Sequence, residues 1–226
     1  MNTFRRAFAL FALSAVLAFS AFSAVPVAIE TARAHTAAGS FGCTVSGETV
    51  ATPSVLTCTA AHGLVDGDQV QVTGIVGTTT DNVTGYAKVT SYSTTTFALY
   101  SDAALSAGVT GTGAYSSGGK VSIAKDISAL SGAFAVRLQV TGLTAAKNAV
   151  LCVQDSADGF VSDIVTLACA NVSGPISAGS GVPVSYTWTS YQLPSLRAGV
   201  TNGRLRLNVS SIDGSATVTT SLFFEQ

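Results

Sequence analysis

Short runs in which apolar and polar residues alternate make up most of the chain beyond residue 51. In the run Gln69–Thr73, Val70 and Val72 share one face, and the run Ala133–Val140 has apolar residues at every second position. A period of two is typical of a strand with one buried face. No part of this region keeps the period of an amphipathic helix over several turns. The pattern therefore predicts an all-β fold.

The predicted strands form two groups, which meet at Gly118 and Gly119. The first group lies within about residues 43–117 and includes the runs 69–73, 86–90 and 95–100. The second group comprises the runs 133–140, 149–153, 164–169, 182–189, 204–209 and 216–224. Strands at this spacing, joined by loops rich in Gly, Pro and Asn, are typical of sandwiches and jelly rolls. We therefore expect a small β-barrel domain in residues 35–118, followed by an antiparallel, jelly-roll-like β-sandwich in residues 119–226.

Residues 1–34 have a different pattern. Arg5 and Arg6 precede Ala7–Ala24, a run without any charged residue. A basic start, an apolar stretch and small residues at a cleavage site are the features of a secretory signal. A retained apolar helix, spanning a membrane or buried between subunits, fits the same length, so both interpretations stay open. Two candidate cleavage sites follow the apolar run, and the second matches the A-x-A rule better: Phe22-Ser23-Ala24 and Ala32-Arg33-Ala34.

A series of glycine, aromatic and β-branched positions in the first group resembles a known module. The series runs through His62-Gly63-Leu64-x-x-Gly67-Asp68-x-Val70-x-Val72-x-Gly74, Gly85-Tyr86, Thr96-Phe97-x-Leu99-Tyr100 and Gly113-x-Tyr115-x-Ser117-Gly118-Gly119. Over about residues 53–120 it resembles the small β-barrel similar to the first catalytic-cysteine half-domain of ubiquitin-activating enzymes. That module recurs in tail, fibre and capsid-decoration proteins of tailed bacteriophages. The resemblance implies a β scaffold without ubiquitin chemistry, because a fold does not carry its function with it.

Two phrases in the second group also resemble a C-terminal sandwich of phage virion proteins. They are Gln154–Phe160 and Tyr191-Gln192-Leu193-Pro194. Both resemblances imply a virion protein that needs neither a catalytic site nor a cofactor.

The four cysteines divide evenly between the two predicted domains. Cys43 and Cys58 flank a predicted turn, and Cys152 and Cys169 flank the loop Asp155–Asp163. Each pair fits on neighbouring antiparallel strands, and a disulfide closing a loop of this size contributes about 3 kcal/mol. Four cysteines allow three connectivities, and four buried free thiols are the alternative. The spacing does not favour a zinc tetrad, because no Cys-x-x-Cys is present and no histidine is near three of the cysteines.

Three carboxylates in one loop are candidates for a cation site. Asp155, Asp158 and Asp163 offer the oxygen ligands that Ca²⁺ prefers, although their spacing matches no EF-hand loop. A solvated Asp-Gly turn is the simpler interpretation. His62 is a candidate base, but no nucleophile motif accompanies it, so we expect a structural role in a turn.

Aromatic and basic residues late in the chain offer two candidate surfaces. Tyr186, Trp188 and Tyr191 fit either a carbohydrate-stacking platform or packing in a core or interface. Arg204 and Arg206 share one face of a predicted strand, and with the earlier Arg197 they make a basic patch. An exposed strand face or a subunit salt bridge explains these arginines without nucleic acid.

Composition narrows the function further. The chain is 47% hydrophobic and only 10% charged, with 11 Lys and Arg against 12 Asp and Glu. Disordered tails, coiled coils and helical repeats need more charge than this, and a balanced chain does not attract nucleic acid through bulk charge. No paired carboxylates or nucleophile–base motif appear in a recognisable context, which predicts a non-enzymatic protein without cofactors.

The sequence therefore predicts a structural protein of a bacteriophage virion, of the decoration or fibre type, on the capsid or tail surface. It would contact copies of itself and other virion proteins, and a membrane only if residues 1–34 are retained. Weakly charged apolar faces suit such contacts. The alternative is a secreted or surface-anchored bacterial protein that is adhesive or binds a surface glycan. The apolar N-terminal segment favours this alternative, because virion proteins assembled in the cytoplasm need no export signal.

Overall fold

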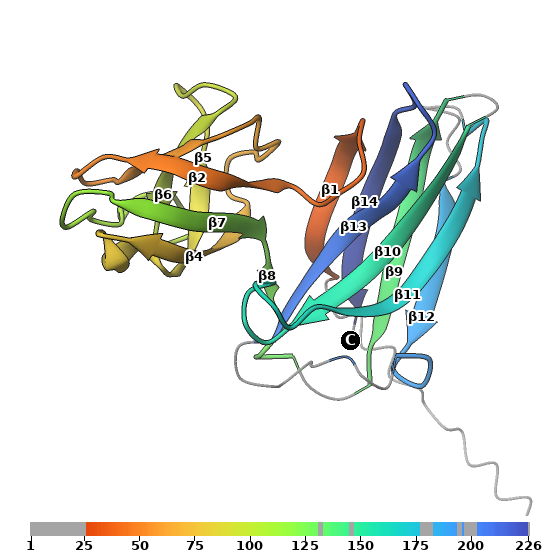
Figure 1. Ribbon diagram of the computed structural model, residues 1–226. Helices are drawn as coiled ribbons and strands as arrows, with labels where there is room; N and C mark the ends of the chain where they lie inside the picture. The colour runs from red at the N-terminus through yellow and green to blue at the C-terminus, as the bar shows by residue number, and fades with distance from the viewer. Residues whose placement is uncertain are drawn as a thin grey trace, which may run out of the picture.

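The computed structural model describes residues 26–130, 133–144, 147–176, 183–193, 196 and 203–225. Their regular structure consists of β-strands and one short 3₁₀ helix, which confirms the all-β prediction. Figure 1 shows two modules side by side, a small barrel and a larger sandwich. The apolar run Ala7–Ala24, predicted to be a secretory signal or a retained helix, lies outside the described part of the chain. In the described part, no helix is long and apolar enough to cross a membrane.

Six antiparallel strands close the barrel, so this module has no free sheet edge. In order around the barrel they are β2 (Gly42–Glu48), β3 (Val55–Cys58), β6 (Thr96–Tyr100), β5 (Thr84–Lys88), β4 (Gln69–Val76) and β7 (Ser117–Ile123), and the helix η1 (Thr79–Asp81) follows β4. The predicted alternation places Val70 and Val72 in the barrel core, where they pack with Phe97 and Leu99.

Two four-stranded antiparallel sheets form the sandwich. One has the order β1 (Val27–His35), β14 (Val218–Glu225), β9 (Ala135–Leu143) and β12 (Val184–Thr189). The other has the order β11 (Val165–Ser173), β10 (Asn148–Ser156), β13 (Arg204–Ile212) and β8 (Lys125–Asp126). Counted along the chain within this module, the first sheet contains the first, eighth, third and sixth strands, and the second contains the fifth, fourth, seventh and second.

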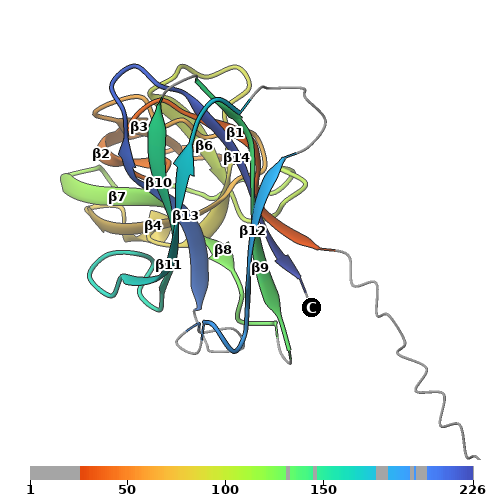
Figure 2. The same cartoon turned by 90° about the vertical axis from the view of Figure 1, so that its right-hand side faces the viewer.

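The sandwich core lies between the two sheets and follows the predicted pattern. Val136, Leu138 and Val140 of β9 face Leu205 and Leu207 of β13 within one apolar cluster. These residues alternate with polar ones along each strand, and the β-branched and leucine side chains fill the space between the sheets. Figure 2 views the molecule from the sandwich side, so that β11 and β12 lie in front of the barrel strands.

The structure differs from the sequence-based division at both domain boundaries. The strand β1 lies inside the predicted segment 1–34, but it pairs with β14 and so belongs to the sandwich. The strand β7 extends to Ile123, beyond the predicted boundary at residue 118, and closes the barrel against β2 and β4. The barrel is therefore inserted between the first and second strands of the sandwich. Pairing between distant segments, which local pattern does not reveal, sets both boundaries.

Candidate functional site

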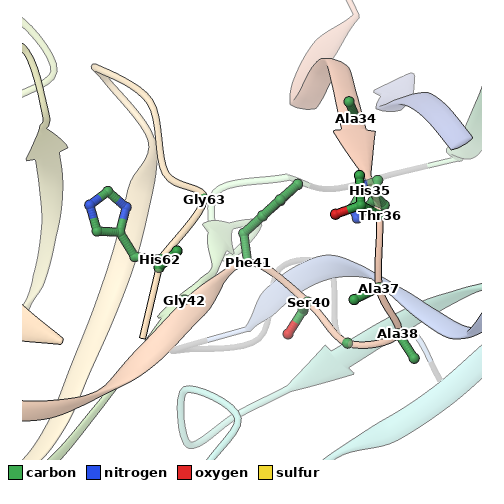
Figure 3. A pocket seen from close by; sticks show the side chains of 12 residues that line it. Ala34, His35, Thr36, Ala37, Ala38, Ser40, Phe41, Gly42, His62 and Gly63 are labelled. Carbon is green, nitrogen blue, oxygen red and sulfur yellow. The ribbon is translucent and has the colours of Figure 1, made fainter. Parts of the chain in front are cut away.

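A pocket of about 340 Å³ lies where the chain passes from β1 into the barrel. Its walls are the linker 34–42 and the turn 61–63, and most of the lining residues are Ala, Gly, Ser or Thr. In Figure 3, the ring of Phe41 extends from the linker toward His35. The two rings stack with their centroids 4.4 Å apart. The chemistry of this pocket depends on His35, His62 and Phe41, because its other lining residues have small side chains.

Both histidines of the pocket are engaged in hydrogen bonds. His35 is buried, and its Nε2 lies 2.9 Å from Glu30 Oε1 and 3.1 Å from Thr220 Oγ1. His62 Nδ1 accepts a hydrogen bond from the backbone N–H of Leu64, and its Nε2 lies 3.3 Å from the Thr96 carbonyl. His62 thus fixes the turn that precedes β4, which agrees with the structural role predicted from sequence.

A buried ion pair joins the two modules beside this pocket. Arg33 belongs to β1, and both of its Nη atoms donate hydrogen bonds to the Asp68 carboxylate of the barrel, with N–O distances of 2.9–3.0 Å. Arg33 Nη2 also donates to the Gly63 carbonyl, and its guanidinium lies 4.4 Å from the centre of the Phe41 ring. Burial raises the pKa of Asp68, and the charge of Arg33 offsets only part of this effect. The ion pair therefore has a positioning role between β1 and the barrel.

Arg204 and Arg206 lie buried at a second part of the junction, so the predicted exposed basic face is wrong. Their side chains do share one face of β13, as predicted, but the two residues are only 6% and 5% exposed. Arg204 forms an ion pair with Asp126 and donates to Thr84 of the barrel. Arg206 donates to Gln154 and stacks on the Phe160 ring at 3.9 Å, and burial lowers its pKa to about 10. The barrel and the loop after β10 cover this face of β13, which the alternating pattern alone predicts to be exposed. Arg197 lies outside the described residues.

The predicted calcium loop is held together by its own hydrogen bonds. Burial raises the pKa of Asp158, but donors from Ser162, Asp163 and Ser156 outweigh it and keep this pKa well below its usual range. These donors, with the Val161 N–H, occupy both oxygens of that carboxylate. Asp155 is buried in β10. The described part of the chain contains no group of three acidic, histidine or cysteine residues arranged around a common metal position.

The three late aromatic residues do not form one surface. Tyr186 and Trp188 point inward from β12 and pack on the sandwich core, with their rings stacked 6.2 Å apart. The Tyr186 hydroxyl donates to the Asn171 carbonyl of β11, which ties together the outer strands of the two sheets. Tyr191 follows β12 and is 93% exposed. The packing alternative therefore describes the first two residues, and only Tyr191 is presented to solvent.

Two disulfides confirm the pairing within each module. Cys43 bonds to Cys58 across β2 and β3, and Cys152 bonds to Cys169 across β10 and β11. Their Cα atoms lie 5.7 Å and 4.1 Å apart. The alternative of four free thiols is wrong, since the protein has no free cysteine. Each module thus has its own covalent link between neighbouring strands.

A pair of carboxyl groups at one end of the barrel was not found by sequence reasoning. Ser54 Oγ lies 3.2 Å from Glu48 Oε1 and also contacts Asp81 Oδ2. A hydroxyl has one proton to donate, so both contacts are hydrogen bonds only when one of the two acids is protonated. Burial, with Asp81 beside it, raises the pKa of Glu48 to about 7. The two acids lie far apart in sequence, Glu48 at the end of β2 and Asp81 at the end of η1, and no local signal links them.

Replacing Glu48 should remove a pH dependence of the barrel. Because the folded pKa of Glu48 is raised from 4.5 to about 7, wild-type stability falls as pH rises through this window. In Glu48→Gln the amide donates to Asp81 without a titrating proton, so the part of the slope that Glu48 contributes disappears. Glu48 is partly exposed, so we expect a gain of only about 1 kcal/mol at about pH 8. Urea denaturation at several pH values measures it.

Asp102→Asn is the matched control for this prediction. Asp102 is a partly exposed carboxylate in the loop after β6, and hydrogen bonds from Ser106 and Ala107 keep its pKa below the usual value. Its replacement should leave the wild-type slope between about pH 5 and pH 8 unchanged. A slope that is as steep in Glu48→Gln as in the wild type would show that the acid pair does not titrate in this window.

Neither models of known protein families nor curated protein sequences give a match. Inferences about function therefore rest on the residues and the fold.

Proposed function

We propose that this chain is a non-enzymatic structural subunit on the surface of a bacteriophage virion, of the decoration or fibre type. The order of the sandwich strands supports a jelly roll, because the first, eighth, third and sixth strands face the second, seventh, fourth and fifth. Jelly rolls are a common architecture of viral capsid domains and of lectins. An architecture shared by unrelated functions is not sufficient alone, so the proposal depends on how the barrel is attached.

The attachment of the barrel is the observation that carries the proposal. The chain passes from the sandwich into the barrel after β1 and returns to the sandwich at β8. Polar contacts hold the barrel against the sandwich at both connections. On one side Arg33 binds Asp68, and on the other Arg204 binds Thr84. Lys120 of β7 also donates to the Phe160 carbonyl of the sandwich. A module held at several points is a rigid projection, which suits a particle surface better than a hinged enzyme cleft.

The chemistry of the junction agrees with a structural role. Its charged groups are used in contacts between the modules, and the histidines of its pocket are engaged in hydrogen bonds. Groups that act in catalysis need a reachable substrate position beside them. At the junction, the buried charged groups instead form contacts that hold one module against the other.

A second candidate is a secreted or surface-anchored bacterial protein with an adhesive or glycan-binding role. The two disulfides favour it, because disulfides persist in oxidising surroundings outside the cytosol. Virion surfaces also belong to these surroundings, so the disulfides agree with both proposals. Of Tyr186, Trp188 and Tyr191, only Tyr191 has a ring that is exposed for stacking on a sugar.

Fractionation of cultures that produce the protein separates the two candidates. We expect the full chain to sediment with infectious particles in a density gradient, in a constant ratio to the major capsid protein. Mass spectrometry of the gradient fractions measures this ratio. Recovery of the chain only in the cell envelope or in particle-free medium would contradict the virion proposal and favour the second candidate. Binding of the purified chain to immobilised glycans, lost in Tyr191→Ala, would then support an adhesive role.

A further inference from the structure

The two sheets of the sandwich have four outer strands, and three of them carry features that prevent pairing with another chain. The strand β8 has only two residues, both charged. The strand β1 carries Glu30 and Arg33 and has two register irregularities against β14. The strand β11 has one irregularity in its register with β10. Short length, charge and bulges are the devices by which proteins protect open sheet edges.

The fourth outer strand, β12, lacks all of these devices. Its six residues, Val184–Thr189, include no charged residue and no proline. Its register with β9 is regular over the whole strand. The segment consists of β-branched, aromatic and serine residues, a composition with high strand propensity and no charge. Within the described part of the chain, no strand lies beyond β12 in its sheet.

Exposed apolar side chains lie at both ends of β12. Val184 begins the strand and is 39% exposed, and Tyr191, two positions after its end, is 93% exposed. In an antiparallel pair of identical strands, the start of one strand lies beside the end of the other. Val184 would then approach Tyr191 of the partner subunit, so that one contact buries both exposed residues.

We propose that β12 is the edge through which two copies of this chain associate, by antiparallel pairing of their β12 strands. A second copy is the partner that suits an uncharged edge, since identical charged strands repel each other when they pair. Self-pairing through a two-fold axis joins the two four-stranded sheets into one continuous sheet. Figure 1 shows β12 on the side of the sandwich away from the barrel, so the barrel does not obstruct this contact. The inference rests on the proposed function, to which it adds the assembly surface.

The solution mass of the full chain, with charged substitutions on β12, tests the inference. Thr187 is exposed near the middle of the strand. Light scattering over a wide concentration range should give the mass of a dimer for the wild-type chain. In Thr187→Lys the paired strands bring like charges together, and the dissociation constant should rise by about tenfold or more. An equal mixture of Thr187→Lys and Thr187→Glu should recover the dimer, which a merely misfolded strand would not do.

Thr31→Lys is the matched control, because Thr31 is an exposed threonine on β1, the opposite edge of the same sheet. It should keep the wild-type mass. A monomeric wild-type chain, or a dimer that Thr187→Lys leaves intact, would overturn the β12 interface. Neither result bears on particle association, which the density gradient measures separately. A chain found in particles but insensitive to Thr187→Lys would thus keep the proposed function and lose only this interface.

Discussion

A chain that begins at Pro26 should fold as stably as the full chain, whereas a chain that begins at Thr36 should lose the sandwich. The second deletion removes β1 and with it the buried side chain of Ile29. It also removes Glu30, the partner of Thr220 on β14, and Arg33, the partner of Asp68 in the barrel. The deletion thus removes strand pairing and apolar burial, and it leaves Asp68 buried without a partner. The loss in the free energy of unfolding should exceed about 5 kcal/mol, which is the whole stability of many domains.

Thermal unfolding followed by circular dichroism, with light scattering for aggregation, measures this difference. The chain that begins at Pro26 is the control, because it keeps every described strand. The chain that begins at Thr36 should also aggregate, since β14 becomes an open edge that is half apolar. Equal melting temperatures of the two chains would contradict the assignment of β1 to the sandwich.

The same strand separates the two candidate cleavage sites. If export removes a leader, cleavage after Ala24 preserves β1, whereas cleavage after Ala34 removes most of it. The second site matches the A-x-A rule better, but its Arg33 is buried in the ion pair with Asp68. N-terminal sequencing of exported protein should therefore begin at Val25.

The strands and the disulfides could be predicted because their signals are local. Alternation over a few residues predicted β4, β9 and β13, and the spacing of the cysteines favoured both disulfides while leaving free thiols as the alternative. Local patterns therefore specify which residues form strands and which of their faces is apolar.

Contacts between distant segments were beyond the reach of these patterns. The alternation placed Arg204 and Arg206 on one face of β13 correctly, but only the inserted barrel decides that this face is buried. Likewise, β1 becomes a sandwich strand through contacts such as the Ala32 N–H with Ser221, 189 positions away. The apolar segment before β1 made the whole N-terminal region resemble a leader, although the strand itself carries Glu30 and Arg33. Charged residues after an apolar run are the signal that separates the two.

Arg33→Ala should destabilise the protein by about 3–5 kcal/mol, the largest effect expected of a single substitution. The change leaves the Asp68 carboxylate buried without its partner, and it also removes the contacts of the guanidinium with Gly63 and Phe41. Burial already raises the pKa of Asp68, and loss of Arg33 raises it further. A carboxyl whose pKa is raised in the folded state makes the free energy of unfolding fall as pH increases. The loss of stability in Arg33→Ala should therefore be larger at about pH 7 than at about pH 4.

Urea denaturation of variants measures both the size and the cause of this effect. Arg137→Ala is the matched control, because Arg137 and Glu225 form an ion pair whose side chains are 27% and 33% exposed, against 8% and 13% for Arg33 and Asp68. An exposed pair contributes only about 0–1 kcal/mol, so this control should unfold almost as the wild type does. The double variant Arg33→Met with Asp68→Leu should recover much of the loss, since it leaves no unpaired charge. If Arg33→Ala cost no more than Arg137→Ala, the ion pair would not be what fixes the barrel to the sandwich, and the rigid projection on which the proposed function depends would lose its main support.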